Sequence, residues 1–267
     1  MLNYDLIVPV MRRLAIEAAA EIMEVYGTDD FGVRSKNDES PVTIADERAD
    51  AVISAGLRAE FPDIALVTEE QADSHSVAAD VFFIVDPLDG TKEFIKRRGD
   101  FTVNIALVEH GRPTRGVVFA PARRRMFWTR PDGQSVEETG DFAAENPGNA
   151  APINVATPGA ELTVVASKSH RDQATDDYIN TYPVGAFESA GSSLKFCLVA
   201  AGEADIYPRL GRTMEWDTAA GDAVLRGAGG QMVRFDDHTT FTYGKPGFEN
   251  PFFIAYAPGV SLKKGAA

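Results

Sequence analysis

The sequence predicts a protein of mixed α and β structure. Segments with the 3.6-residue apolar spacing of helices alternate with short β-branched and aromatic segments typical of strands. No internal repeat or low-complexity tract interrupts this alternation. At 267 residues with 44% hydrophobic content, the chain is long enough for one large or two modest domains with ordinary buried cores. We therefore expect a soluble globular protein.

The first elements are two helices and a strand. Apolar residues recur at helical spacing through residues 6–26, and Gly27 is a natural end for that helix. A polar stretch at 34–41 leads into a second helical pattern over 42–60, which the following Phe-Pro pair ends. Residues 64–67 then indicate a strand that runs into two glutamates.

The middle of the chain is strand-like. Residues 81–85 are β-branched and aromatic, which indicates a buried strand followed by a turn. Residues 102–108 and 116–119 flank a turn at 110–113, so they predict an antiparallel hairpin.

The stretch 131–158 is rich in Gly, Pro, Asn and acidic residues, so it is the best candidate for a boundary. We expect an N-terminal α+β part over 1–150 and a C-terminal α/β part over 151–267. Short strands could still lie inside the boundary stretch.

The second half continues the alternation of strands and helices. The expected elements, in order, are a strand at 162–166, a polar helix to about Tyr182, helices at 192–201 and 217–229, and strands at 231–235 and 251–256.

Two carboxylates follow the strand at 81–85. Asp86 and Asp89 enclose the carbonyl of Leu88, and the hydroxyl of Thr91 comes two residues later. An oxygen-only ligand set suits a hard cation such as Mg²⁺, and the lack of His or Cys in this run argues against zinc.

Two distant acids extend this set. Glu69 ends the strand at 64–67, and Asp217 opens a predicted helix whose small residues 219–221 would allow close backbone approach. Taken alone, Glu69 could be a solvated strand end, Asp89 a turn residue and Asp217 a helix cap. Together the acids could hold two Mg²⁺ ions bridged by Asp86, which is the chemistry of phosphate ester hydrolysis by water.

Charge and cysteine content restrict the partners and the location. A net charge of −14 repels polymeric nucleic acid. Basic clusters at Lys92, 96–98 and 123–125 would suffice for a small phosphorylated ligand, although 123–125 could equally be a solvated loop. The single Cys197 lies in an apolar stretch, which indicates an inert core residue in a reducing compartment. We find no signal peptide pattern and no apolar run near about 18 residues, so we expect a cytoplasmic protein without a transmembrane segment, with peripheral attachment to the inner membrane left open.

These motifs resemble a known family. Segments 69–70, 86–91 and 216–221, in this order, resemble the signatures of the magnesium-dependent, lithium-sensitive inositol monophosphatase superfamily. Within it, four further segments resemble the CysQ-type 3′(2′),5′-bisphosphate nucleotidases: 36–43, 89–96, 167–170 and 191–199. Those enzymes of sulfur metabolism convert 3′-phosphoadenosine 5′-phosphate to AMP and phosphate. The resemblance also implies an αβαβα sandwich with the site between its two parts.

The resemblance implies a role for each matching position. Two or three Mg²⁺ ions would be held by Glu69, Asp86, the Leu88 carbonyl, Asp89 and Asp217. Thr91 and Asp46 would activate the attacking water. The substrate-binding set would be Glu69, Leu88, Asp89, Gly90, Thr91, Lys92, Ser169, His170, Ser192, Lys195, Arg209 and Asp217.

Within that set, the backbone N–H groups of Gly90 and Thr91 would hold the scissile phosphate. Ser192 and Lys195 are three apart and would share one helix face toward the second phosphate. His170 could instead be a helix cap.

Two other interpretations stay open. One is a phosphatase for inositol phosphates or sugar bisphosphates, and the other is a non-catalytic protein that binds phosphorylated metabolites. Lys92 and the Ser192/Lys195 pair favour a bisphosphate, because a second phosphate needs further cations. Thr91 and the acids disfavour pure binding, which requires no water activator. The segment 132–152 matches no motif, and the sequence leaves the oligomeric state open.

Overall fold

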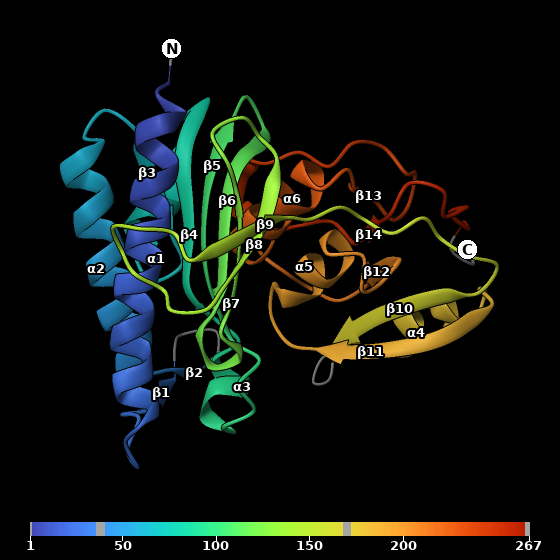
Figure 1. Ribbon diagram of the computed structural model, residues 1–267, viewed down its shortest axis with the longest axis horizontal. Helices are drawn as coiled ribbons and strands as arrows, with labels where there is room; N and C mark the ends of the chain where they lie inside the picture. Colours follow the sequence, from blue (N-terminus) through green and yellow to red (C-terminus); the bar gives the residue numbers. More distant parts are fainter. Residues whose placement is uncertain (1, 36–40, 168–171, 265–267) are drawn as a thin grey trace.

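The computed structural model describes residues 2–35, 41–167 and 172–264, and it has five layers (Figure 1). Helices α1 and α2 cover one face of a seven-stranded sheet, and α5 and α6 cover the other. A five-stranded sheet follows, with α4 on its far side. The αβαβα sandwich is therefore confirmed.

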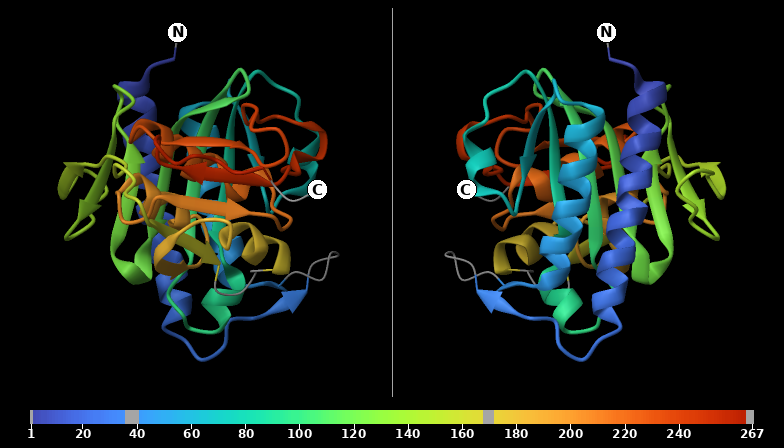
Figure 2. Two further views of the ribbon diagram at one scale, coloured as in Figure 1. Left: turned by 90° about the vertical axis from the view of Figure 1, so that its right-hand side faces the viewer. Right: turned by 90° about the vertical axis from the view of Figure 1, so that its left-hand side faces the viewer.

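The two N-terminal helices lie side by side over the outer face of the first sheet (Figure 2, right). They span α1 Tyr4–Tyr26 and α2 Ile44–Glu60, close to the predicted ranges. The apolar stripe of α1 is buried, as its spacing requires. Helix α2 begins with a capping box in which Thr43 and Asp46 satisfy each other's backbone N–H groups.

The first sheet has the order β3-β4-β5-β6-β7-β8-β9, parallel between β3 and β4 and antiparallel elsewhere. Its strands are β3 Ala65–Thr68, β4 Val81–Asp89, β5 Thr102–Glu109, β6 Arg112–Ala120, β7 Arg125–Thr129, β8 Ser135–Thr139 and β9 Asn149–Pro152. Shorter elements of this half are β1 Arg34–Ser35, β2 Pro41–Val42, η1 Ala72–Ser76, α3 Thr91–Ile95 and η2 Pro121–Arg123. The predicted hairpin is confirmed as β5 and β6.

The stretch 131–158 contributes to the first sheet. Strands β8 and β9 lie inside it, so the sheet extends to Pro152. Glu138 on β8 is fully buried and accepts two hydrogen bonds from Arg12 of α1, at 2.6 and 2.7 Å. Arg12 also donates to the carbonyls of Ala143 and Ala144, which ties this acidic stretch to α1. The division at 150/151 stays a prediction.

The second sheet has the order β11-β10-β12-β14-β13, parallel among the first three strands. Its strands are β10 Leu162–Ser167, β11 Val184–Ala190, β12 Ile206–Arg209, β13 Gln231–Arg234 and β14 Phe253–Tyr256. The helices and turns of this half are α4 Gln173–Ile179, α5 Leu194–Ala200, η3 Glu215–Asp217, α6 Ala219–Gly227 and η4 Pro246–Phe248. The sequence patterns do not predict β11 and β12, because β11 is an exposed edge strand and β12 is four residues long and contains a proline.

Helix α6 lies very close to the first sheet. A Cβ placed on Gly116 of β6 would lie 2.5 Å from the Ala220 carbonyl oxygen of α6, so only glycine allows this approach. A Cβ on Gly221 would lie 2.5 Å from the ring of Phe196 on α5. Between these layers Cys197 is fully buried, as predicted. Within the described residues, no helix combines the length and apolar composition needed to cross a membrane.

Candidate active site

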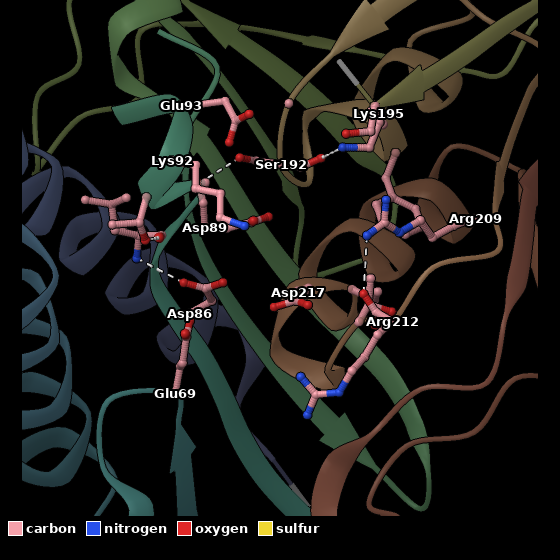
Figure 3. Close-up of a pocket in the computed structure, with 18 of the residues that line it drawn as sticks. Glu69, Asp86, Asp89, Lys92, Glu93, Ser192, Lys195, Arg209, Arg212 and Asp217 are labelled. Atoms are coloured by element: carbon pink, nitrogen blue, oxygen red, sulfur yellow. Dashed lines mark hydrogen bonds between the residues drawn. The ribbon is translucent and has the colours of Figure 1, made fainter. Parts of the chain in front are cut away.

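A cavity of about 240 Å³ lies where the two halves of the chain meet (Figure 3). Its wall combines the ends of β3 and β4 with α3 from the first half, and α5, β12 and η3 from the second. The residues that the sequence singled out and that line it are Glu69, Asp86, Leu88, Asp89, Gly90, Thr91, Lys92, Ser192, Lys195, Arg209 and Asp217.

The segment Asp86 to Asp89 is a bulged strand end, and the turn comes later than predicted. Both acids lie in β4, opposite Asn104 and Thr102 of β5, with the irregularity between them. Gly90 then adopts φ 94°, a left-handed conformation that favours glycine. The bulge lets both acids line the cavity.

Three carboxylates converge at the floor of the cavity. One oxygen each from Glu69, Asp86 and Asp217 lies within 4.8 Å of the other two (Figure 3). Burial, together with the charges of Asp89 and Glu69, raises the pKa of Asp217 well above its usual range. Such a cluster of oxygen donors fits a hard divalent cation, which would offset the repulsion between the carboxylates.

Asp89 lies beside this cluster. Burial raises its pKa to about 6, with Lys195 opposing the rise. Its Oδ2 accepts hydrogen bonds from the Ser193 backbone N–H at 2.7 Å and from Asn104 at 3.2 Å. Sequence reasoning missed Asn104 and Ser193, although a polar Asn inside an apolar strand is a usable signal.

Asp217 ends the short helix η3 and does not open α6, which starts two residues later. Its Oδ2 accepts from the Met214 backbone N–H at 2.8 Å, and its carbonyl accepts from the Ser193 hydroxyl at 2.6 Å. The carboxylate is therefore held by the turn that carries it.

Thr91 and Asp46 form a hydrogen-bonded pair. The Thr91 hydroxyl donates to Asp46 Oδ1 at 3.1 Å, and Asp46 Oδ2 accepts from the backbone N–H and hydroxyl of Thr43. Asp46 is 1% exposed. Asp46 Oδ1 is the nearer acceptor for the Thr91 hydroxyl, since the Leu88 carbonyl oxygen lies 3.4 Å away, and Thr91 Oγ1 keeps a lone pair that can accept a proton.

The prediction that Ser192 and Lys195 share one helix face is wrong, because α5 begins at Leu194. Ser192 precedes α5 with φ 50°, and its hydroxyl lies 2.7 Å from the Asp89 carbonyl and 2.8 Å from the Asp100 carbonyl. Lys195 donates to the Ser192 carbonyl at 2.6 Å, and burial lowers its pKa to about 8. Ser192 therefore joins the two halves at the edge of the cavity.

Further cations line the cavity. Arg209 donates to the Arg212 carbonyl at 3.2 Å, and the sequence did not single out the exposed Arg212. Lys92 of α3 lies on the opposite wall from Arg209 (Figure 3). Glu93, Tyr207 and Thr213 also line the cavity, and sequence reasoning missed them. Ser169 and His170 lie outside the described residues.

The basic run 123–125 takes no part in this wall. Arg123 donates to the buried Asp100, Arg124 pairs with Asp141, and Arg125 pairs with Glu137. Arg125 also pairs with Glu203 of the second half, so the run makes ion pairs with neighbouring acids outside the cavity wall.

Fold and site together define a class of phosphate-handling proteins, and the chain belongs to the inositol monophosphatase family, whose model matches residues 3–252. Members of this family are generally magnesium-dependent. Among its relatives, the 3′(2′),5′-bisphosphate nucleotidase CysQ of Escherichia coli K12 is 43% identical over 244 residues, covering 90% of this chain and 96% of the relative. The CysQ of Buchnera aphidicola is 40% identical over 223 residues, covering 82% of this chain and 81% of that protein.

Solved structures of the same family have the same fold as this chain. The crystal structure of CysQ from Bacteroides thetaiotaomicron is similar with a TM-score of 0.81 and 36% identity, covering 93% of this chain and 96% of the other. An inositol monophosphatase from Thermotoga maritima, 24% identical, has the same fold with a TM-score of 0.76 and coverage of 93% and 91%.

Proposed function

We propose that this protein is a magnesium-dependent 3′(2′),5′-bisphosphate nucleotidase that converts 3′-phosphoadenosine 5′-phosphate to AMP and phosphate. The observation that carries the proposal is the combination, in one cavity, of three converging carboxylates with the cations Lys92, Lys195, Arg209 and Arg212. A phosphomonoester needs the carboxylates and their metal, whereas a second phosphate on the same ligand needs additional positive charge. The names of the relatives support the same substrate class.

The acids would hold two or three Mg²⁺ ions through Glu69, Asp86, Asp89, Asp217 and the Leu88 carbonyl. When bound, the metal polarises the phosphate ester, lowers the pKa of a water and stabilises charge on the leaving oxygen. Side chains and backbone groups of this chain would transfer the protons and hold the phosphates.

Proton transfer is assigned to the Thr91–Asp46 pair. The attacking water gives a proton to Thr91 Oγ1, while the Thr91 hydroxyl passes its own proton to Asp46 Oδ1 at 3.1 Å. The water oxygen forms the new bond to phosphorus as the bond to the ribose oxygen breaks, and that ribose oxygen takes up a proton from solvent. The backbone N–H groups of Gly90 and Thr91 would hold the phosphate during this exchange.

The second phosphate would lie toward Lys195, Arg209 and Lys92. We place Ser192 in a supporting role, because two backbone carbonyls already compete for its single hydroxyl proton. A cytoplasmic location is supported by the buried free thiol of Cys197, and we expect lithium sensitivity and a role in sulfur metabolism.

The test is phosphate release by the purified protein with Mg²⁺. We would compare 3′-phosphoadenosine 5′-phosphate, inositol 1-phosphate and fructose 1,6-bisphosphate, each with and without lithium. Lithium-sensitive preference for the adenosine bisphosphate is expected. Preference for another ester would reassign the cations of the cavity, and no release from any of the three would favour pure binding.

Asp86→Asn tests the metal assignment, since the variant keeps the size of the side chain and removes its charge. Because Asp86 is one of the three converging carboxylates that would hold the metal, the change should lower turnover by about 10²-fold or more, while the unfolding midpoint without metal is retained. Lys195→Ala should mainly raise KM for the bisphosphate. Wild-type turnover by Asp86→Asn would contradict the metal assignment.

A further inference from the structure

We propose that His75 is a positioning residue of the metal site, because its imidazole connects the segment that carries Glu69 to the segment that carries Asp217. The inference rests on the metal site of the proposed function and extends it to a residue outside the cavity wall. His75 lies on η1, which follows shortly after the pair of glutamates at the end of β3.

The first contact of His75 is a hydrogen bond to the residue that precedes Glu69. Its Nε2 lies 2.9 Å from the Thr68 carbonyl oxygen, and because a carbonyl only accepts, Nε2 carries the proton. The same carbonyl accepts from the Gln71 backbone N–H at 3.3 Å, whereas the single proton of the Ser74 hydroxyl goes to the closer Gln71 carbonyl at 2.6 Å. Thr68 is bonded to Glu69, so the hydrogen bonds from His75 and Gln71 fix the backbone directly before that ligand.

The second contact of His75 is a ring stack on the residue that precedes Asp217. Its imidazole stacks on the indole of Trp216, with ring centroids 4.7 Å apart and an interplanar angle of 25°. Trp216 is 7% exposed and directly precedes Asp217. The ring centroid of Phe248 lies 6.5 Å from that of His75 and 6.2 Å from that of Trp216. The stack is therefore held in place by its surroundings.

The connection matters because the two ligands come from different halves of the molecule. Glu69 follows the edge strand of the first sheet, and Asp217 ends η3 in the second half. Their carboxylates, with that of Asp86, lie within 4.8 Å of one another and repel when no cation is bound. A rigid contact between the two carrying segments keeps the spacing of the ligands, so the cation binds with less rearrangement.

The test is Mn²⁺ binding followed by electron paramagnetic resonance, since Mn²⁺ takes the same oxygen ligands as Mg²⁺. His75→Ala removes both contacts, His75→Phe keeps a ring for the stack, and His75→Gln keeps a donor. His238→Asn is the matched control, because this histidine lies in the turn after β13, where its backbone N–H donates to the Arg234 carbonyl. We expect His75→Ala to raise the Mn²⁺ dissociation constant about 10- to 100-fold, with smaller increases for His75→Phe and His75→Gln and none for the control.

Two further readouts separate positioning from general stability. The Mg²⁺ concentration for half-maximal phosphate release should rise in parallel with the Mn²⁺ dissociation constant, while kcat at saturating Mg²⁺ stays near the wild-type value. The urea midpoint of the metal-free protein identifies any variant that has lost its fold. If His75→Ala is such a variant, the metal affinities of His75→Phe and His75→Gln test the positioning role instead.

Wild-type metal affinity in a folded His75→Ala would overturn the inference and leave the proposed function intact. If His75→Ala does not fold, wild-type affinity in both His75→Phe and His75→Gln would overturn it, because each of these variants lacks one of the two contacts. Failure of the wild-type protein itself to bind Mn²⁺ would instead overturn the metal site on which the proposed function depends.

Discussion

Four acids at or beside the cavity are each oriented by a nearby backbone group. In every case a backbone N–H donates to one carboxylate oxygen: Thr43 to Asp46, Leu88 to Asp86, Ser193 to Asp89 and Met214 to Asp217. Such hydrogen bonds favour the ionised form and restrict the side-chain rotamer. The direction of these carboxylates is therefore set by backbone geometry before any metal binds.

Thr91 donates to one of these oriented acids, Asp46, and is the proposed acceptor of the proton from the attacking water. Thr91→Val keeps the shape of the side chain and removes the hydroxyl, so kcat should fall about 10²- to 10⁴-fold, in the range expected for lost general-base catalysis. Steady-state phosphate release at saturating Mg²⁺ measures this effect.

Thr91→Ser is the matched control, because it retains an oxygen within reach of Asp46, and it should keep most of the activity. A Val variant as active as the Ser variant would remove Thr91 from the proton path.

At the scale of elements, the position of Asp217 depends on how closely α6 packs against the first sheet. Gly116 of β6 lies against the Ala220 carbonyl, and Gly221 lies against Phe196 of α5. Because the helix starts two residues after Asp217, any outward shift of α6 would move this carboxylate away from Glu69 and Asp86.

Gly116→Ala tests this packing. The added Cβ would meet the Ala220 carbonyl oxygen at 2.5 Å, and a backbone oxygen cannot rotate away, so the free energy of unfolding should fall by about 1–3 kcal/mol. Urea denaturation measures the loss, and the Mg²⁺ requirement for activity should rise with it.

Gly159→Ala is the control, since the nearest atom to its added Cβ is 3.6 Å away and its change should stay within about 0.5 kcal/mol. Equal stability of the two variants would contradict the close approach.

At the scale of the whole molecule, the site joins the two halves. Glu69, Asp86 and Asp89 come from the first half, whereas Asp217 and Lys195 come from the second. A cation held by acids from both halves binds only the folded chain, so metal binding should stabilise the whole protein.

This linkage should depend on pH. Burial raises the pKa of Asp89 to about 6 and that of Asp217 in the same direction, above about 3.9 in the unfolded chain. The metal-free folded state therefore binds protons more tightly than the unfolded state, and this contribution to stability is lost as pH rises through about 6. Protons compete with Mg²⁺ for these carboxylates, so the increase in Tm caused by Mg²⁺ should grow between about pH 5 and about pH 7.5.

Thermal unfolding with Mg²⁺ and with EDTA across this pH range measures the difference. An increase that shrinks toward neutral pH would contradict the raised pKa values. Asp86→Asn should lose most of the Mg²⁺ effect at every pH.

Local patterns predict the helices α1 and α2, the β5–β6 hairpin and the strands β3, β4 and β10, because their apolar periodicity reflects burial on one or both faces. Strand β11 escapes this reasoning, since five successive residues of it are exposed and leave no alternation to detect. Strands β8 and β9 are hidden in a polar stretch, where the Arg12–Glu138 pair stabilises what composition alone would assign to a loop.

Residue types and their order along the chain predict the chemistry of the protein: an oxygen-only set of acids next to strands and short helices, a hydroxyl beside them, and basic residues close to them. Which of these groups meet depends on the tertiary structure. It placed Glu69, Asp86 and Asp217 in one cluster, removed Ser192 from the helix face it was expected to share with Lys195, and brought His75 between two ligand segments that lie far apart in the chain. Local patterns report the burial of each element, whereas the distances between side chains from separate layers follow from the packing of helices between two sheets, which no local pattern contains.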